Sequence, residues 1–270
     1  MQDKGIESGM IRKSLYHKLN PILVKLYKVM CRFRPFEMVL DFTAWKLFRN
    51  TGIPFLESIH STGSAELDWD TRAKVDGLIT ATGQANEEKA GASAIKAVEN
   101  RILRGLQVDR HFVVLEIGCG IGNLLKPMAS QVGEAHGVDI SGEMLRLAAE
   151  RLKGYSNIFL HKTDGSLAMF TDDYFDIVFS SGVFIHFPSK PMVYEYFKEA
   201  ARVLKPGGIF RFNMDGRNYL RWRRKEGGTL RGVVFDSAEI RENLEKCGFR
   251  VQDMSGMNSL DMWATAVLPK

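Results

Sequence analysis

Long hydrophobic runs and paired cysteines are both missing from this sequence. No apolar stretch approaches the roughly 18 residues that a spanning helix needs, and the first ten residues are largely polar, so we expect neither a transmembrane helix nor a secretory signal. The three cysteines, Cys31, Cys119 and Cys247, lie far apart, without a CxxC motif or a histidine at metal-ligand spacing. This pattern argues against a disulfide framework and against a zinc site. We therefore expect free thiols, no bound metal and a cytoplasmic location.

Internal repeats and low-complexity tracts are also absent, which argues against fibres and disordered chains. With 270 residues and 45% hydrophobic content, the chain can bury one sizeable core. The net charge of +5 is uneven, because residues 1–50 hold ten Lys and Arg against four Asp and Glu. Residues 51–270 are close to neutral, so we expect no nucleic-acid partner.

The basic amino-terminal segment has a helical pattern. Residues 11–49 read as two amphipathic helices, the first starting at Asn20-Pro21 and the second following the interruption at Arg34-Pro35. Two interpretations remain open for this pair. The helices pack on the core or form a dimer contact, or they lie peripherally in the inner face of a membrane near anionic lipid.

The pattern changes at about residue 108, where short apolar runs alternate with amphipathic segments. The strand candidates are FVVLEI, AHGV, NIFLHK, FDIVFS, GIFRFNM, FRVQDM and MWATAVL, and the helical patterns lie at 123–131, 141–153, 191–204 and 237–247. This alternation predicts a parallel sheet with helices on both faces. Only SGMNSLD separates the last two strands, so the final strand must be antiparallel. We assign residues 1–66 to a helical extension and linker, and 67–270 to one α/β domain with helices at 67–107 before the sheet.

Three glycines at alternate positions follow the first predicted strand, in the stretch VVLEIGCGIGNLL. Open parallel sheets bind ligands at the carboxyl ends of their strands, so Gly118, Gly120 and Gly122 predict a ligand cradle. The GxGxG spacing differs from the GxGxxG of dinucleotide folds, and Glu116 precedes it. An acid at this position favours a cationic ligand over a pyrophosphate.

The next two predicted strands also end in acids. Asp139, in HGVDIS, lies 21 positions after Gly118, where a carboxylate can bridge the two hydroxyls of a ribose. Asp164, in HKTDG, can accept an exocyclic amine beside Gly165. A cation near Glu116, a ribose at Asp139 and an adenine near Asp164 together describe S-adenosylmethionine.

Five segments resemble, in order, the motifs of class I S-adenosylmethionine-dependent methyltransferases, and specifically the bacterial small-molecule group called type 11. These are LEIGCGIGN, GVDIS, TDG, FDIVFSSGVFIHF and EAARVLKPGGIFRF, within residues 105–268. The resemblance implies a Rossmann-like, doubly wound, seven-stranded sheet, mostly parallel with an antiparallel last strand. Residues 1–66 have no counterpart in the minimal family fold. The cofactor-binding residues expected from the motifs and their neighbours are Glu116, Gly118, Cys119, Gly120, Gly122, Asn123, Asp139, Ile140, Asp164, Gly165, Ser180 and Ser181.

Methyl transfer to a hydroxyl needs a base near the methyl group. His186, beyond the fourth predicted strand, is the first candidate, since an imidazole titrates in the right range. The alternative is a histidine that only packs the turn. Asp215, past the fifth strand, is a second candidate that could equally cap the next segment or hold a divalent ion. The stretch 215–232, rich in Arg and aromatic residues, is either a lid over the acceptor or a solvated loop.

Two further segments bear on the acceptor. The segments FSSGVFIHFP and GGIFRFN resemble methyltransferases of bacterial glycan synthesis, which makes a saccharide or lipid-linked glycan hydroxyl the first expectation. A phenolic or amine natural product is the first alternative. A non-catalytic S-adenosylmethionine-binding interaction module is an alternative of another class.

Overall fold

The structure, a computed structural model, describes residues 64–82, 84, 86–217 and 232–270. The chain divides into two compact units, Met1–His60 and Ser61–Lys270. The expected helices of 11–49 and the Arg-rich residues 218–231 lie outside the described residues. Within the described ranges, no helix combines the length and the apolar character needed to cross a bilayer. The second unit, Ser61–Lys270, contains the sheet and the helices that pack on it.

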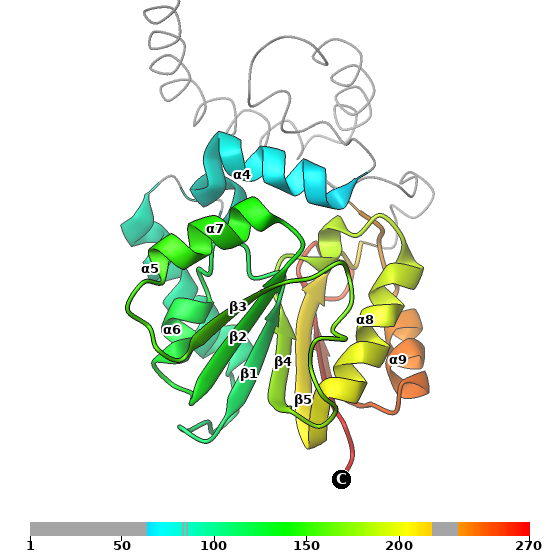
Figure 1. Ribbon diagram of the computed structural model, residues 1–270. Coiled ribbons are helices and arrows are strands. Elements are labelled where there is room, and N and C mark those ends of the chain that lie inside the picture. The colour runs from blue at the N-terminus through cyan, green and yellow to red at the C-terminus, as the bar shows by residue number, and fades with distance from the viewer. Residues whose placement is uncertain (1–63, 83, 85, 218–231) are drawn as a thin grey trace, which may run out of the picture. The chain divides into compact units, whose positions relative to one another are not determined.

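Seven strands form one sheet in the order β3-β2-β1-β4-β5-β7-β6 (Figure 1). They are β1 (Val113–Ile117), β2 (Glu134–Asp139), β3 (Ile158–Lys162), β4 (Phe175–Ser180), β5 (Leu204–Met214), β6 (Arg250–Ser255) and β7 (Met262–Val267). Strands β1 to β5 pair in parallel, and β7 is antiparallel to both β5 and β6. The predicted Rossmann-like fold with a reversed last strand is confirmed. Because the strand order reverses between β1 and β4, the ligand-binding crevice of such a sheet is expected beside these two strands.

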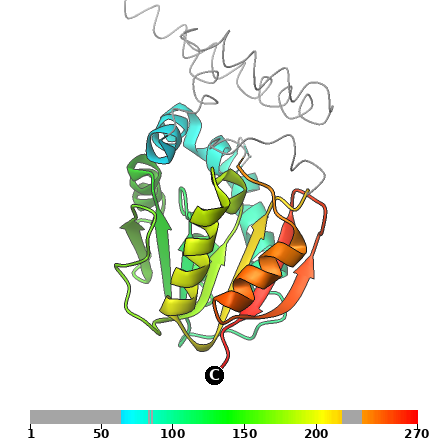
Figure 2. The same cartoon turned by 90° about the vertical axis from the view of Figure 1, so that its right-hand side faces the viewer.

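Helices cover both faces of the sheet and one of its ends. They are α4 (Ala65–Thr82), α5 (Glu87–Ala97) continued by the π-turn η1 (Val98–Ile102), α6 (Leu125–Ala129), α7 (Gly142–Arg151), α8 (Lys190–Val203) and α9 (Ser237–Lys246). Figure 2 shows α8 and α9 side by side on one face, and η1, α6 and α7 pack on the other. Helix α4 lies across the carboxyl ends of the parallel strands (Figure 1). Helix α6 is shorter than the predicted 123–131, because the turn that contains the glycines continues to Leu124.

The ends of α9 follow the sequence signals. Asp236 caps the helix by accepting a hydrogen bond from the Ala238 amide at 2.9 Å, and Gly248 adopts a φ of +89° after the last turn, as expected for a helix stop. The Asp236 and Glu239 pair had the spacing of a capping box. Glu239 accepts from the backbone of Asp236, as in a capping box, and also bonds the Lys190 ammonium at 2.5 Å, so its carboxylate fastens α9 to α8 as well.

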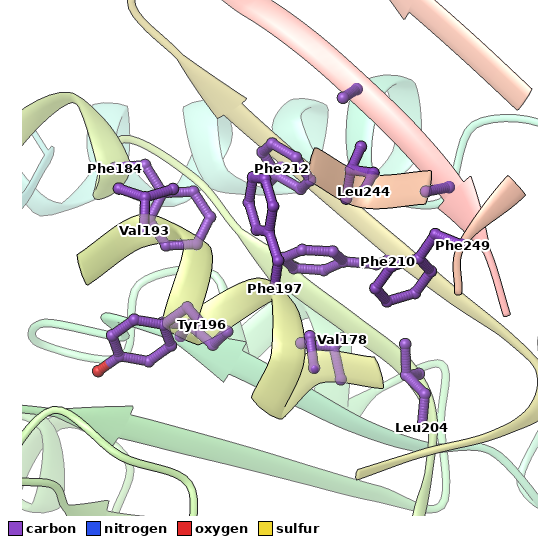
Figure 3. Packing of buried hydrophobic residues seen from close by; sticks show 14 of the residues in the cluster. Val178, Phe184, Val193, Tyr196, Phe197, Leu204, Phe210, Phe212, Leu244 and Phe249 are labelled. Carbon is purple, nitrogen blue, oxygen red and sulfur yellow. The ribbon is translucent and has the colours of Figure 1, made fainter. Parts of the chain in front are cut away.

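An aromatic cluster between the sheet and α8 fixes the turn that follows β4. Phe197, Phe210 and Phe212 are fully buried and contact one another. Phe184, in the 3-10 turn η2 (Phe184–His186), packs against Phe212 with ring centroids 5.5 Å apart (Figure 3). Removing a buried phenylalanine ring typically costs about 3–5 kcal/mol. This packing holds the turn, and therefore His186, at a fixed place above the sheet.

Candidate cofactor site

A cavity of about 370 Å³ lies at the carboxyl ends of the parallel strands, under α4 and α5. Its walls come from the tips of β1, β2, β3 and β4, as the topology predicted. Among the predicted residues, the lining includes Glu116, Gly118, Cys119, Gly120, Asn123, Asp139, Ile140, Asp164, Gly165, Ser181 and His186. Gly122, Ser180 and Asp215 lie outside the lining.

Two glycines of the loop, Gly118 and Gly122, lie where a side chain would meet a neighbouring residue. Gly118 adopts a φ of +73°, and a Cβ there would lie 2.5 Å from Val183, so a side chain would press the loop against the turn after β4. The amides of Gly118 and Cys119 both donate to the Val138 carbonyl, which fixes the loop on β2. A Cβ on Gly122 would lie 2.4 Å from Leu152, at the end of α7. Gly118 therefore keeps the loop close to the cavity, whereas Gly122 lets α7 pack beneath it.

Asp139 is held by backbone amides at the tip of β2. Its Oδ2 accepts from the Gly120 amide at 2.8 Å, and its Oδ1 accepts from the Ser141 amide at 2.9 Å. Burial raises the pKa of Asp139, while these hydrogen bonds oppose that shift. A carboxylate offers about four acceptor sites, and the Ile140 amide also bonds Asp139, so about one site remains for a hydroxyl group in the cavity.

Glu116 is a buried acid with an unused oxygen. Its side chain lines the cavity and is 2% exposed, and its Oε2 has no hydrogen-bond partner among the described residues. Burial raises the pKa of Glu116 well above its ordinary value of 4.5, and the nearby Asp139 adds to the shift. Buried polar atoms are nearly always paired, so this oxygen fits a cationic ligand.

The tip of β3 forms the third wall. Asp164 is exposed, and its Oδ1 accepts from the Ser166 amide at 3.1 Å. The amide of Gly165 donates to the Thr163 hydroxyl at 3.0 Å, which tightens the turn. Tyr196 of α8 also lines the cavity, and its hydroxyl points away from the aromatic cluster (Figure 3). Burial raises the pKa of Tyr196 to about 12, against the opposing effect of a hydrogen bond with the Thr163 side chain, so the phenol stays protonated.

The tip of β4 presents its backbone to the cavity through Ser181 and Gly182. Ser180 is fully buried, and its hydroxyl donates to the Ile117 carbonyl at 3.1 Å, so it ties β4 to β1. The Gly182 amide donates to Asn213 Oδ1 at 2.7 Å, and Asn213 Nδ2 donates to Asp261 Oδ1 at 2.8 Å. Asn213 and Asp261 do not line the cavity, but their hydrogen bonds hold Gly182 in its wall.

The two predicted bases lie in different surroundings. His186 lines the cavity, and its ring meets Trp69 of α4 edge-on, with centroids 4.9 Å apart. Asp215 is fully buried, and both of its carboxylate oxygens accept from the Arg217 guanidinium at 2.9 Å. Within the described part of the chain, no group of three or more His, Cys, Asp or Glu is placed to hold a metal ion. His186 is therefore the better placed of the two to reach a ligand in the cavity.

Comparison with known proteins agrees with this geometry. Residues 114–208 match the family model of the methyltransferase domain. A segment of 109 residues is 36% identical to phosphoethanolamine N-methyltransferase 2 of Caenorhabditis elegans, covering 39% of this chain and 24% of that protein. A segment of 117 residues is 32% identical to demethylmenaquinone methyltransferase of Staphylococcus carnosus, covering 42% and 47%. The chain thus spans less than half of the length of these two curated relatives.

Solved structures share the fold. The N-methyltransferase NodS of Bradyrhizobium japonicum, in complex with S-adenosylhomocysteine, superposes with a TM-score of 0.55 at 17% identity, covering 76% of this chain and 99% of NodS. The PH0226 protein of Pyrococcus horikoshii gives a TM-score of 0.56 at 23% identity, covering 71% and 96%. The second unit contains a class I S-adenosylmethionine-dependent methyltransferase domain. This confirms the predicted family and its cofactor, S-adenosylmethionine.

The side chains of the methyltransferase domain fit that cofactor. The unpaired oxygen of Glu116 matches a ligand that carries positive charge. Asp139 has a free acceptor site for a ribose hydroxyl, and Asp164 has acceptor oxygens at the exposed tip of β3. Gly118 leaves no room for a side chain where the loop faces the cavity. Bound there, the cofactor supplies an electrophilic methyl group, and the protein supplies the alignment.

Three residues in or beside the cavity wall escaped the sequence motifs. Tyr196 had a signal, because it lies on the apolar face of a predicted helix, although that pattern indicates burial rather than binding. Asn213 and Asp261 had none, because their partners are distant in sequence. Asn213 is 31 residues from Gly182 and 48 from Asp261.

Proposed function

We propose that this protein transfers the methyl group of S-adenosylmethionine to a hydroxyl of a saccharide or lipid-linked glycan. The observation that carries the proposal is the place of His186, which lines the same cavity as Glu116 and Asp139. Methyl transfer is an in-line displacement in which the new O–C bond forms as the C–S bond breaks. The sulfur leaves as a neutral thioether and needs no proton, so the remaining task is to take the proton of the hydroxyl. We assign that task to the imidazole of His186.

The wall around His186 supports a ring-shaped acceptor. Trp69, Phe187 and Met192 line this part of the cavity and offer flat or apolar surface. Excluding water there strengthens the polar interactions at the reacting atoms. The same wall also suits an aromatic small molecule, so a phenolic or amine acceptor is the second candidate function.

A lipid-linked acceptor agrees with the charge of the amino-terminal segment. Residues 1–50 hold ten basic and four acidic side chains, and basic amphipathic helices bind anionic membrane surfaces. We propose that residues 11–49 hold the protein peripherally on such a surface. Full-length protein should then bind vesicles of anionic lipid and detach as salt is raised. Equal binding to neutral and anionic vesicles would contradict this proposal.

The test of the catalytic assignment compares two histidines. His186→Ala should reduce turnover by roughly 10²-fold or more, with unchanged affinity for S-adenosylhomocysteine, when acceptors are screened by mass shift. His111→Ala is the matched control, because His111 is exposed and precedes β1 at the opposite end of the sheet. Near-normal turnover by His186→Ala would reduce His186 to a packing role. Tight cofactor binding without turnover on any acceptor would favour a non-catalytic binding module.

A further inference from the structure

Helix α4 forms a roof over the cofactor cavity. Ala65, Trp69 and Thr82, spread along the helix, all line the cavity. Figure 1 shows the helix lying across the carboxyl ends of the strands and beside α7. A bound cofactor would therefore lie between the sheet and this helix, and its exchange depends on how firmly the helix is attached.

One polar attachment of the roof is made at the proposed ribose-binding turn after β2. Asp70 of α4 accepts a hydrogen bond from the Ser141 hydroxyl at 2.5 Å and a second from the Glu143 amide at 3.1 Å. Ser141 is fully buried, and its hydroxyl also accepts from the Met144 amide at 3.1 Å. The Ser141 amide donates to Asp139 at 2.9 Å. One serine thus joins the roof, the first turn of α7 and the ribose carboxylate.

The neighbouring residue of α4 reaches the opposite wall. Successive residues of an α-helix point about 100° apart, so Trp69 and Asp70 face different sides. Trp69 contacts the ring of His186 after β4, whereas Asp70 holds Ser141 after β2. The helix therefore spans the cavity from the ribose side to the proposed base.

The contact of α4 with the tip of β3 is more exposed to solvent. Glu66 pairs with Lys162 at 2.5 Å, but the two side chains are 47% and 55% exposed. Solvent screens such pairs, which contribute little to stability. Asp70 differs because its partners, the Ser141 hydroxyl and a helix amide, belong to a buried cap.

We propose that Asp70 is a positioning residue that latches α4 over the bound cofactor and fixes the Ser141 turn in the geometry that lets Asp139 hold the ribose. This inference rests on the cofactor site assigned above, not on the identity of the acceptor. Release of the cofactor or its by-product then requires Asp70 to leave Ser141.

The test measures release of labelled S-adenosylhomocysteine, chased with excess unlabelled compound, from the full-length protein. Asp70→Ala loses both hydrogen bonds and should release the compound about tenfold faster or more. Asp70→Asn keeps an acceptor oxygen and should lie between this variant and the wild type, which also keeps the test usable if Asp70→Ala folds poorly. Glu66→Gln is the matched control on the same helix and should stay within about twofold of the wild type.

A second measurement separates a latch from a merely structural residue. Hydrogen exchange of the α4 amides should slow when S-adenosylhomocysteine binds to the wild type and to Glu66→Gln, and much less in Asp70→Ala. Wild-type release rates in Asp70→Ala and Asp70→Asn would overturn the latch, as would an equal effect of Glu66→Gln. A wild-type protein that binds no S-adenosylhomocysteine would overturn the cofactor site itself, and the latch with it.

Discussion

Glu116→Gln should make the cofactor-free protein more stable and the cofactor-bound protein weaker. The substitution keeps the shape of the side chain, which is 2% exposed and has an unpaired Oε2, and it removes the charge that Glu116 carries above its raised pKa. An unsatisfied buried group costs about 1–3 kcal/mol, and a charged one more. We therefore expect a gain of about 1–3 kcal/mol without cofactor, or roughly 2–4 °C in Tm per kcal/mol for a domain of this size.

The gain should depend on pH in a defined direction. Burial raises the pKa of Glu116 above its ordinary value of 4.5, so the folded protein keeps a proton that the unfolded chain loses as pH rises. The wild type then loses stability relative to Glu116→Gln as pH rises from about 4.5 towards the raised pKa. Below that window both side chains are neutral, and the two proteins should converge.

Cofactor binding should respond with the opposite sign. A charge-assisted hydrogen bond contributes about 1.5–3 kcal/mol, so Glu116→Gln should bind S-adenosylmethionine roughly 10- to 150-fold more weakly. Because a cation favours the ionised carboxylate, binding to the wild type should release a proton below the raised pKa and strengthen as pH rises. The variant should lack this proton release.

Calorimetry in two buffers with different ionisation enthalpies measures affinity and proton release together, and thermal unfolding across pH measures stability. A variant that binds the cofactor as tightly as the wild type would refute the role of Glu116. A variant that is less stable than the wild type at alkaline pH would refute the reasoning from burial.

Three further substitutions test other parts of the site. Asp139→Ala should weaken S-adenosylhomocysteine binding by about 1–3 kcal/mol in calorimetry, and unchanged affinity would contradict the ribose assignment. Asn213→Ala leaves the Gly182 amide without its 2.7 Å acceptor and should raise the Kd several-fold; an unchanged affinity would remove Asn213 from the cofactor wall. Gly122→Val, at a φ of +72° and facing Leu152, should lower the free energy of unfolding by about 1–3 kcal/mol. It should change the affinity for S-adenosylhomocysteine little. A loss of affinity larger than the loss of stability would place Gly122 in the site.

The sheet and the acids that line the cavity were predictable because their signals are local. A strand followed by Gly118 and Gly120 must turn at the edge where parallel strands end, whatever the rest of the chain does. The acids after β2 and β3 reach the same edge for the same reason. The sequence therefore predicted which strand ends meet, and with them Glu116, Asp139 and Asp164.

The remaining details depend on contacts between distant residues. Ser180 and Ser181 are adjacent, but successive residues of a strand face opposite sides, so only the pairing of β4 with β1 shows that Ser180 bonds Ile117. The Asp70 contact with Ser141 spans 71 residues, and no periodicity in α4 indicates it. The capping-box spacing of Glu239 predicted its bond to the Asp236 backbone, but not its second partner, Lys190 on another helix. Tertiary partners decided these positions, and a single sequence does not reveal them.

The most direct test of the central claim is a crystal structure of the full-length protein with S-adenosylhomocysteine. The account predicts the ribose on Asp139, the adenine beside Asp164 and Gly165, and the amino acid part against the Gly118 loop near Glu116, all beneath α4. Density for the compound anywhere else on the molecule would contradict it.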